Sequence, residues 1–532
     1  MRSRLASACR RAPTFLAVLA AATALDPAAA SAIQDVDPAA VDAVFADIDA
    51  DVPGCAVGVY DAGEVLYANG YGLANADYGL PITPQSVFYL GSVGKQFTAA
   101  AVLHAVQAGH ISLDDPVQKW ITEMPDYDAP VTVRHLVHHT SGVRDYLTLM
   151  SLAAIAIETP MSDAAVTELI ARQEGLNFTP GDRYLYSNSG YFLLAEIVER
   201  ATGSTLRQYL EEHFLGPLGM ESTRVNDDRR EPMPNRVVGY RVVDGELRMD
   251  HPWTFDKVGS GGVYSSIEDM ARWDRNWFTE EVGGAGFSEA LLQRGVLNDG
   301  TELPYAFGLG VREYRGAPIV EHGGSLMAFR SQLLRFPEHE ITTMVACSFP
   351  TADAGARARR VADAVLGDRL EPVVADDAAA APTGAAMDLP DAPPPSLTDE
   401  QLDRFVGAWR ASMGIEIAIE REGSNLFFLQ GPQRAPLRIV AEDRVALPMA
   451  QIDMRFSDLR DGRYHHQDVT QGPSSFTAER IGAGDEADWS QYTGTYYSSE
   501  LDVTWEIVVT DDGALARAAA GPERTLGYVS PD

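Results

Sequence analysis

A serine and a lysine three residues apart are the first pair in the chain whose types and spacing could carry out chemistry. Ser92 follows Gly91 at the start of a largely apolar stretch, and Lys95 lies on the same face if that stretch is helical. We expect a buried helix that stops near Gly109, with Ser92 in its first turn, where free N–H groups favour negative charge. Burial would lower the pKa of Lys95, and a neutral amine could take the Ser92 proton. The same spacing also fits a capping serine followed by a lysine that reaches solvent.

Two more polar groups lie far along the chain. Tyr186-Ser187-Asn188 falls in a turn-rich loop before an expected helix over 191–201, and His322-Gly323-Gly324-Ser325 lies at the end of an expected strand. A tyrosine whose pKa is near 10 is a poor base at neutral pH, so Tyr186 would need a lysine beside it. The alternative readings are a loop aromatic that packs on the core for Tyr186 and a turn residue for Asn188.

Strands at both ends of one region, with helices between them, must position these groups. We expect strands over residues 53–60, 65–67, 319–324, 330–336 and 341–347, and a closing helix over 356–366. This order is typical of an α+β fold, in which the two ends pair in one antiparallel sheet.

Two patterns could be mistaken for ligand sites. His138 and His139 are adjacent and therefore point in different directions, and no acidic residue or histidine lies at a convincing ligand spacing, so we expect packing or capping rather than metal binding. The glycine-rich loop 259–264 lacks the motifs of phosphate-binding loops, so we expect a close backbone passage near the site. It leads into an apparent capping box of Ser265 and Glu268.

Length and charge limit the classes of protein. The chain of 532 residues predicts two or three domains, and 45% hydrophobic with 22% charged residues is ordinary for globular proteins. A net charge of −34 argues against nucleic acid or an anionic membrane as a partner.

The amino terminus has the pattern of a secretion signal over residues 1–32. A basic start precedes the apolar run 15–25, which is too short to span a bilayer, and Ala30-Ser31-Ala32 is a small-x-small cleavage site. We expect cleavage after Ala32, a secreted or periplasmic protein and no transmembrane segment in the mature chain; an N-terminal anchor is the alternative. Cys55 and Cys347 then remain, both in expected strands. They could be oxidised if they met, but we expect buried free thiols.

The carboxyl-terminal third has a different pattern. Residues 371–397 form an expected linker rich in proline and alanine, and short alternating strands over 398–483 predict a small antiparallel β-barrel. Phe405-Val406-Gly407-Ala408-Trp409 is echoed by Tyr492-Thr493-Gly494-Thr495-Tyr496, which opens a partial second β domain over 484–532. Its open edges would pack on another domain, pair with a second chain or stay loose.

The order and spacing of Ser92-x-x-Lys95, Tyr186-x-Asn188 and His322-x-Gly324, together with their strand and loop context, resemble the serine β-lactamase and penicillin-binding protein family, in its class C-like branch. The resemblance covers about residues 40–370 and includes the segments 137–142 and 259–264. For a domain over 33–370 it implies an antiparallel sheet flanked by helices, an all-helical subdomain, and no metal or cofactor.

The resemblance also implies a role for each residue. Ser92 would attack a carbonyl carbon, and Lys95 and Tyr186 would shuttle its proton. Asn188 would hold the substrate amide and Lys95. The residues expected to contact substrate through the strand are His322, Gly323 and Gly324, and the backbone N–H groups of Ser92 and Ser325 would form the oxyanion hole.

His322 departs from the lysine that β-lactamases usually carry at that position, which argues against strong recognition of a substrate carboxylate. H-x-G is more similar to esterases, D-aminopeptidases and related peptidases. We therefore expect a secreted serine hydrolase that acts on an ester, a small amide or a short peptide. The alternatives are a D-aminopeptidase-like or D-stereospecific peptidase, a slowly turning over penicillin-binding sensor, and a non-catalytic assembly protein. The β domains resemble lipocalin-like modules that border the active site of D-aminopeptidase-type proteins and limit substrate size; the oligomeric state stays open.

Overall fold

The computed structural model describes residues 36–243 and 245–372, and parts of the carboxyl-terminal third: 395, 397–411, 416–430, 433–447, 452–471, 474–481, 492–510, 513–518 and 524–526. The expected signal sequence and nearly all of the expected linker lie outside the described residues. Within those residues, the structure contains no helix with the length and apolar character needed to cross a membrane.

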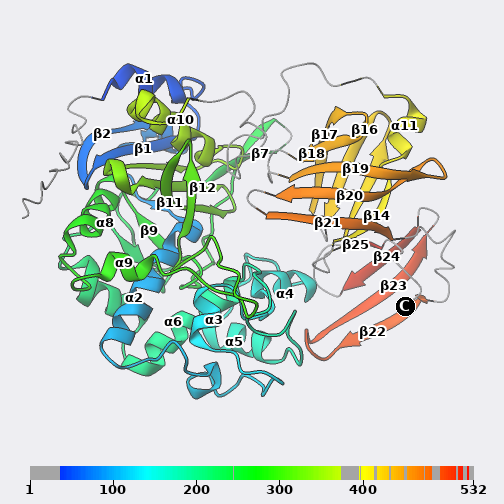
Figure 1. The fold of residues 1–532 in the computed structure, drawn as a ribbon, viewed down its shortest axis with the longest axis horizontal. Helices are drawn as coiled ribbons and strands as arrows, with labels where there is room; N and C mark the ends of the chain where they lie inside the picture. Colours follow the sequence, from blue (N-terminus) through cyan, green and yellow to red (C-terminus); the bar gives the residue numbers. More distant parts are fainter. Residues whose placement is uncertain are drawn as a thin grey trace, which may run out of the picture. The chain divides into compact units, whose positions relative to one another are not determined.

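The first domain is built on an antiparallel sheet of six strands in the order β10-β11-β12-β13-β1-β2 (Figure 1). The strands are β1 (Cys55–Asp61), β2 (Glu64–Tyr71), β10 (Gly310–Tyr314), β11 (Ala317–Leu326), β12 (Phe329–Phe336) and β13 (Ile341–Cys347). The prediction that the two ends of the domain pair is confirmed, because β1 lies antiparallel to β13. The α+β class is confirmed with it.

Helices cover both faces of this sheet. Neighbouring residues of a strand point to opposite faces, and here the Thr342 hydroxyl donates to Asp274 of α8 (Ile267–Thr279) while the Thr343 hydroxyl donates to a carbonyl of α10 (Ala354–Leu366). The sheet is therefore the middle of three layers. The cap of α8 is Ser266, whose hydroxyl accepts from the N–H of Asp269, so the predicted capping box was misplaced.

The remaining helices form the region beside the sheet. They are α2 (Lys95–Gln107), α3 (Val133–Val137), α4 (Tyr146–Leu152), α5 (Asp163–Ala171), α6 (Asn188–Thr202), α7 (Leu206–Leu210) and α9 (Phe287–Leu291), with a π-helical turn at Glu211–Leu215, whereas α1 (Pro38–Asp42) packs on α10. The short strands are β3 (Leu73–Asn75), β4 (Leu80–Pro81), β5 (Phe88–Tyr89), β6 (Arg224–Val225), β7 (Tyr240–Val243), β8 (Glu246–Met249) and β9 (Val263–Ser265). The central helix α2 is buried along most of its length, as its sequence predicts, and packs on α6.

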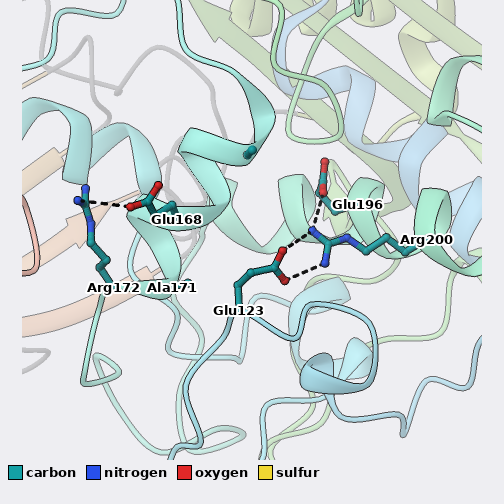
Figure 2. Close-up of a pocket in the computed structure, with 7 residues that line it drawn as sticks. Glu123, Glu168, Ala171, Arg172, Glu196 and Arg200 are labelled. Atoms are coloured by element: carbon teal, nitrogen blue, oxygen red, sulfur yellow. Dashed lines mark hydrogen bonds and ion pairs between the residues drawn. The ribbon is translucent and has the colours of Figure 1, made fainter.

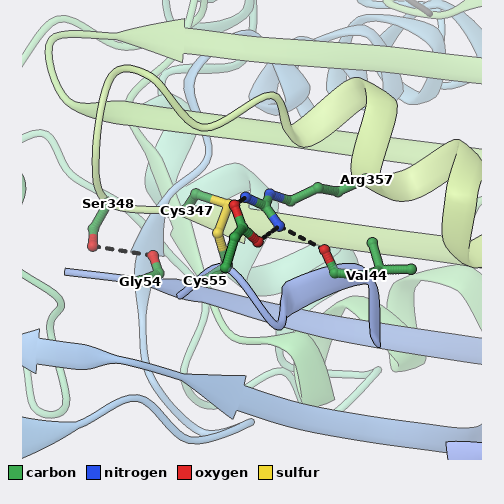
Figure 3. Close-up of a disulfide and its surroundings, with 7 residues drawn as sticks. Val44, Gly54, Cys55, Cys347, Ser348 and Arg357 are labelled. Atoms are coloured by element: carbon green, nitrogen blue, oxygen red, sulfur yellow. Dashed lines mark hydrogen bonds and ion pairs between the residues drawn. A yellow bond between two sulfur atoms is a disulfide. The ribbon is translucent and has the colours of Figure 1, made fainter. Parts of the chain in front are cut away.

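A disulfide joins Cys55 to Cys347, and both cysteines are fully buried (Figure 3). The expectation of free thiols is wrong. The register of β1 and β13 places the two residues directly opposite each other. Beside the bond, Arg357 of α10 donates to Val44 O and pairs with Asp47, which fixes the segment before β1 to α10.

The β-barrel after the linker is closed and has eight antiparallel strands. They are β14 (Gly407–Ala411), β15 (Glu416–Glu422), β16 (Asn425–Gln430), β17 (Gln433–Ala441), β18 (Arg444–Leu447), β19 (Ile452–Arg460), β20 (Arg463–Gln471) and β21 (Ser474–Ile481), preceded by helix α11 (Asp399–Asp403). Its core includes Trp409 of β14, Phe428 of β16 and Phe456 of β19. Core residues alternate along a strand, as Leu426 and Phe428 do on β16. The prediction of a small antiparallel barrel is confirmed.

The second β region is a sheet of four strands: β22 (Gly494–Ser498), β23 (Val503–Thr510), β24 (Gly513–Ala518) and β25 (Arg524–Leu526). Its turn between β22 and β23 contacts the first domain. The Glu500 carboxylate pairs with Arg144 at 3.0 Å and accepts the N–H of Glu174 at 2.8 Å, and Gln173 donates to Glu500 O at 3.0 Å. Of the three possibilities for the partial repeat, these contacts support packing on another domain.

Candidate active site

Ser92 and Lys95 meet at the start of the central helix. A 3₁₀ turn over Gly91–Gly94 carries Ser92, and α2 begins at Lys95, one turn later than the sequence predicts. Gly91 has φ of +55° and lies against β11, where a side chain would approach Ser325 N to 2.8 Å. This close approach holds the turn against the sheet. The Lys95 Nζ lies 3.1 Å from Ser92 Oγ.

Three oxygen atoms surround the Lys95 amine. Besides Ser92 Oγ, Nζ lies 3.0 Å from Asn188 Oδ1 and 2.5 Å from Ser260 O, which are both acceptors. A neutral amine has two N–H donors for these oxygens and a lone pair that can accept the Ser92 hydroxyl. Burial lowers the pKa of Lys95 to about 7, and the negative charge of Asp145 opposes the shift.

The Ser260 carbonyl comes from the glycine-rich loop, so the predicted close backbone passage near the site is confirmed. Thr98 of α2 donates to Gly259 O at 2.9 Å and fixes the same loop one turn further along. Sequence reasoning did not identify the Ser260 carbonyl as a partner of Lys95, because a backbone oxygen carries no side-chain signal.

Tyr186 lies two residues before α6 and faces the same amine. Lys95 Nζ lies 4.8 Å from the centre of its ring. Burial raises the pKa of Tyr186 well above 10, while the nearby Ser92 hydroxyl acts in the opposite direction. The phenol oxygen is buried and has no hydrogen-bond partner of regular geometry among the described residues. Tyr186 is therefore a neutral phenol beside Ser92 at physiological pH.

Asn188 is the first residue of α6, which begins three residues earlier than the sequence predicts. The reason is Asp145, the residue before α4, whose carboxylate accepts the Asn188 N–H at 2.6 Å. An acceptor at this free N–H lets the helix begin at Asn188. The helix start then places Asn188 Oδ1 on Lys95.

His322 of β11 faces the site from the sheet. Its Nδ1 lies 2.6 Å from Gly323 O, and its Nε2 lies 3.1 Å from the Tyr305 hydroxyl. Burial, with a smaller contribution from the positive charge of Lys95, lowers the pKa of His322 to about 3. The ring is neutral, so Nδ1 donates to the carbonyl and Nε2 accepts from Tyr305. No motif marked Tyr305 in the sequence.

The glycines after His322 bring β11 against the turn that carries Ser92. A side chain at Gly324 would lie 2.0 Å from Leu90 O, and Ser331 donates to that carbonyl at 2.6 Å. Gly323 and Ser325 are exposed on the strand, and Ser325 lies beside Gly91. The structure thus brings together the residues of the three motifs, Ser92-x-x-Lys95, Tyr186-x-Asn188 and His322-x-Gly324.

A separate cavity of about 450 Å³ lies in the helical region (Figure 2). Its charged lining residues pair with one another: Arg200 binds Glu123 at 2.8 Å and Glu196 at 3.3 Å, and Arg172 lies 3.9 Å from Glu168. Ser92, Lys95 and Tyr186 are not among its lining residues. Because both of its arginines are already paired with carboxylates, we assign the chemistry to the Ser92 site.

Comparison with known proteins places this geometry in context. A D-aminopeptidase of Gluconobacter oxydans is 32% identical over 326 residues, which are 60% of this chain and 60% of that relative. A D-aminopeptidase of Cereibacter sphaeroides is 28% identical over 493 residues, which are 90% of this chain and 87% of the relative. The first match thus spans less than two thirds of its relative.

The structure of an octameric penicillin-binding protein homologue from Pyrococcus abyssi has the same fold, with a TM-score of 0.56 and 22% identity over 82% of this chain and 98% of that one. The model of the Beta-lactamase family matches residues 41–366. This match covers more than half of the sequence and includes every residue of the site, so the chain belongs to the Beta-lactamase family.

Proposed function

We propose that the protein hydrolyses esters or small amides through an acyl-enzyme on Ser92. The observation that carries this proposal is the buried amine of Lys95, 3.1 Å from Ser92 Oγ, with a pKa of about 7. A base with that pKa is partly neutral at neutral pH and can activate a hydroxyl.

In the proposed acylation step, Ser92 Oγ bonds to the substrate carbonyl carbon as its proton passes to Lys95. The N–H groups of Ser92 and Ser325 stabilise the oxyanion. The Tyr186 phenol donates its proton to the leaving group and regains one from Lys95, so neither residue ends with a changed charge. Water then bonds to the acyl carbon and gives a proton to Lys95, the bond between that carbon and Ser92 Oγ breaks, Oγ regains the proton, and the acid product leaves.

The state of His322 indicates the substrate class. A neutral ring that donates only to Gly323 O offers no cation to a substrate carboxylate. The site therefore favours uncharged ester and amide groups over β-lactams and peptides with a free carboxylate. The names of the relatives, D-aminopeptidases, support a D-amino-acid amide or a short peptide with a D-residue as the second candidate.

We further propose that the mature chain is secreted or periplasmic, since the Cys55–Cys347 disulfide suits an oxidising compartment. We propose domain boundaries at residues 33–370, 398–483 and 484–532. The contact of Glu500 with Arg144, beside Asp145, supports a role for the second β region in limiting substrate size.

The test compares wild type with Ser92→Ala on p-nitrophenyl esters, D-amino-acid amides and a chromogenic cephalosporin. We expect hydrolysis of the first two that the variant abolishes, and poor turnover of the cephalosporin. Activity that survives in Ser92→Ala contradicts the proposal. A stable adduct on Ser92 by mass spectrometry, without multiple turnover, would instead identify a slowly turning over sensor.

A further inference from the structure

We propose that His139 is a positioning residue for Tyr186. It holds the phenol at Ser92 through hydrogen bonds to the residues on both sides of Tyr186 and through contact with its ring. The inference rests on the proposed function, because it assigns a role within the same site. It concerns a histidine for which the sequence predicted only packing or capping.

His139 makes one contact with each of three consecutive residues, Leu185, Tyr186 and Ser187. His139 O accepts the N–H of Leu185 at 2.9 Å, and His139 Nδ1 accepts the N–H of Ser187 at 3.1 Å. Between them, the imidazole stacks on the ring of Tyr186, with centroids 4.2 Å apart and planes 34° from parallel. One residue thus fixes the backbone on either side of Tyr186 and the face of its ring.

The hydrogen bond from Ser187 also fixes the protonation state of His139. Nδ1 accepts a proton, so in the neutral ring the hydrogen is on Nε2. Burial, and then the charge of Lys95, lowers the pKa of His139 well below 6.5. A permanently neutral ring can lie beside Lys95 without adding a second positive charge to the site.

The remaining face of His139 is enclosed by aromatic rings. Tyr305 and Tyr191 lie 4.8 and 5.0 Å from it, centroid to centroid, and its Nε2 is buried without a hydrogen-bond partner among the described residues. A buried donor that is left unpaired costs free energy. The cost is consistent with a ring kept for its stacking and its Nδ1 acceptor.

The backbone explains why few residue types fit. His139 has φ of +57°, a left-handed conformation that asparagine, aspartate and histidine adopt more readily than others. The position requires that backbone conformation, a side-chain acceptor for the Ser187 N–H and an aromatic ring against Tyr186. Histidine supplies all three. The neighbouring His138 provides a contrast, because its ring nitrogens face Arg134 O and Gln293 O and its ring packs on Phe307.

Two substitutions separate the contacts. His139→Asn keeps an acceptor for Ser187 and tolerates the backbone conformation, but removes the ring beneath Tyr186. His139→Phe keeps a ring and removes the acceptor. We expect His139→Asn to lower kcat by about tenfold or more with KM changed less than about threefold, because a misplaced proton carrier slows chemistry more than binding. His138→Asn is the matched control and should lower the melting temperature without lowering kcat.

The pH profile is a readout that a general loss of stability would not move. Water admitted into the space of the missing ring would weaken the desolvation that lowers the pKa of Lys95, so the acid limb of kcat/KM in His139→Asn should move to higher pH. If His139 acts through Tyr186, adding His139→Asn to Tyr186→Phe should cost less than about twofold further.

Folding is checked by the melting temperature of each variant. A folded His139→Asn enzyme with wild-type kcat and pH profile, or a full additional loss in the Tyr186→Phe background, overturns the inference. These results leave the proposed function standing, because that depends on Ser92→Ala. Conversely, if wild-type protein shows no turnover that depends on Ser92, the proposed function is contradicted before His139 is tested.

Discussion

The pH dependence of kcat/KM should follow the protonation of Lys95. Its pKa is about 7, against 10.5 for an ordinary lysine. At pH 7 about half of the molecules would carry the neutral amine, whereas an ordinary lysine would be neutral in about one molecule in 3,000. The difference corresponds to about 5 kcal/mol between the two protonation states, and its main cause is the burial of Nζ.

The assay is kcat/KM for an uncharged p-nitrophenyl ester between about pH 4.5 and 8.5. We expect an acid limb near pH 7 and about 1% of the maximum at pH 5, since the ammonium cannot accept the Ser92 proton. The limb belongs to Lys95 because the pKa of His322 is about 3 and that of His139 is well below 6.5.

The direction in which a substitution moves the acid limb tests whether that limb belongs to Lys95. Asn188→Asp places a carboxylate where Oδ1 now lies, 3.0 Å from Nζ. An opposite charge at that distance stabilises the ammonium and should raise the pKa of Lys95 by about 1–3 units, so the acid limb moves to higher pH. Asn75→Asp, on β3, adds the same charge while keeping its acceptor for Tyr78 N–H, and should leave the limb in place. A wild-type kcat/KM that still rises tenfold per pH unit at the upper end of this range, or a limb that Asn188→Asp leaves unmoved or lowers, refutes the reasoning.

Three further results are expected. Replacing Cys55 and Cys347 by alanine should lower the melting temperature by about 5 °C or more, since the bond closes a loop of 292 residues and the chain-entropy contribution is about 6 kcal/mol; a melting temperature within about 1 °C of wild type would contradict this. His322→Lys should lower KM about tenfold for substrates that carry a carboxylate, relative to neutral ones, in paired kinetics. Asp274→Asn should destabilise the domain by about 3–5 kcal/mol in denaturant titrations, because it leaves the guanidinium of Arg335, 0% exposed, without its partner charge.

Local physics made part of the site predictable from the sequence. The spacing of Ser92 and Lys95 puts both on one face of one turn, and the apolar stretch after them required a buried helix, which the structure has. The alternating strands predicted the barrel and the sheet because a period of two is a property of the strand itself. The order of the motifs indicated the family.

Contacts between distant segments were decided only by the tertiary structure. The disulfide depends on the register of β1 and β13, since a shift by one residue would turn the two cysteines to opposite faces. The Ser260 carbonyl on Lys95 and the Tyr305 hydroxyl on His322 carry no sequence pattern.

The sequence by itself determined which side chains could do the chemistry and that a helix would bury the lysine. Packing around that helix decided how strongly the pKa of Lys95 is lowered, and it placed Tyr186 on His139 and Asn188 on Lys95. The physical reason is that spacing along a helix is fixed by its geometry, whereas desolvation and ring stacking depend on atoms that only the folded chain brings together.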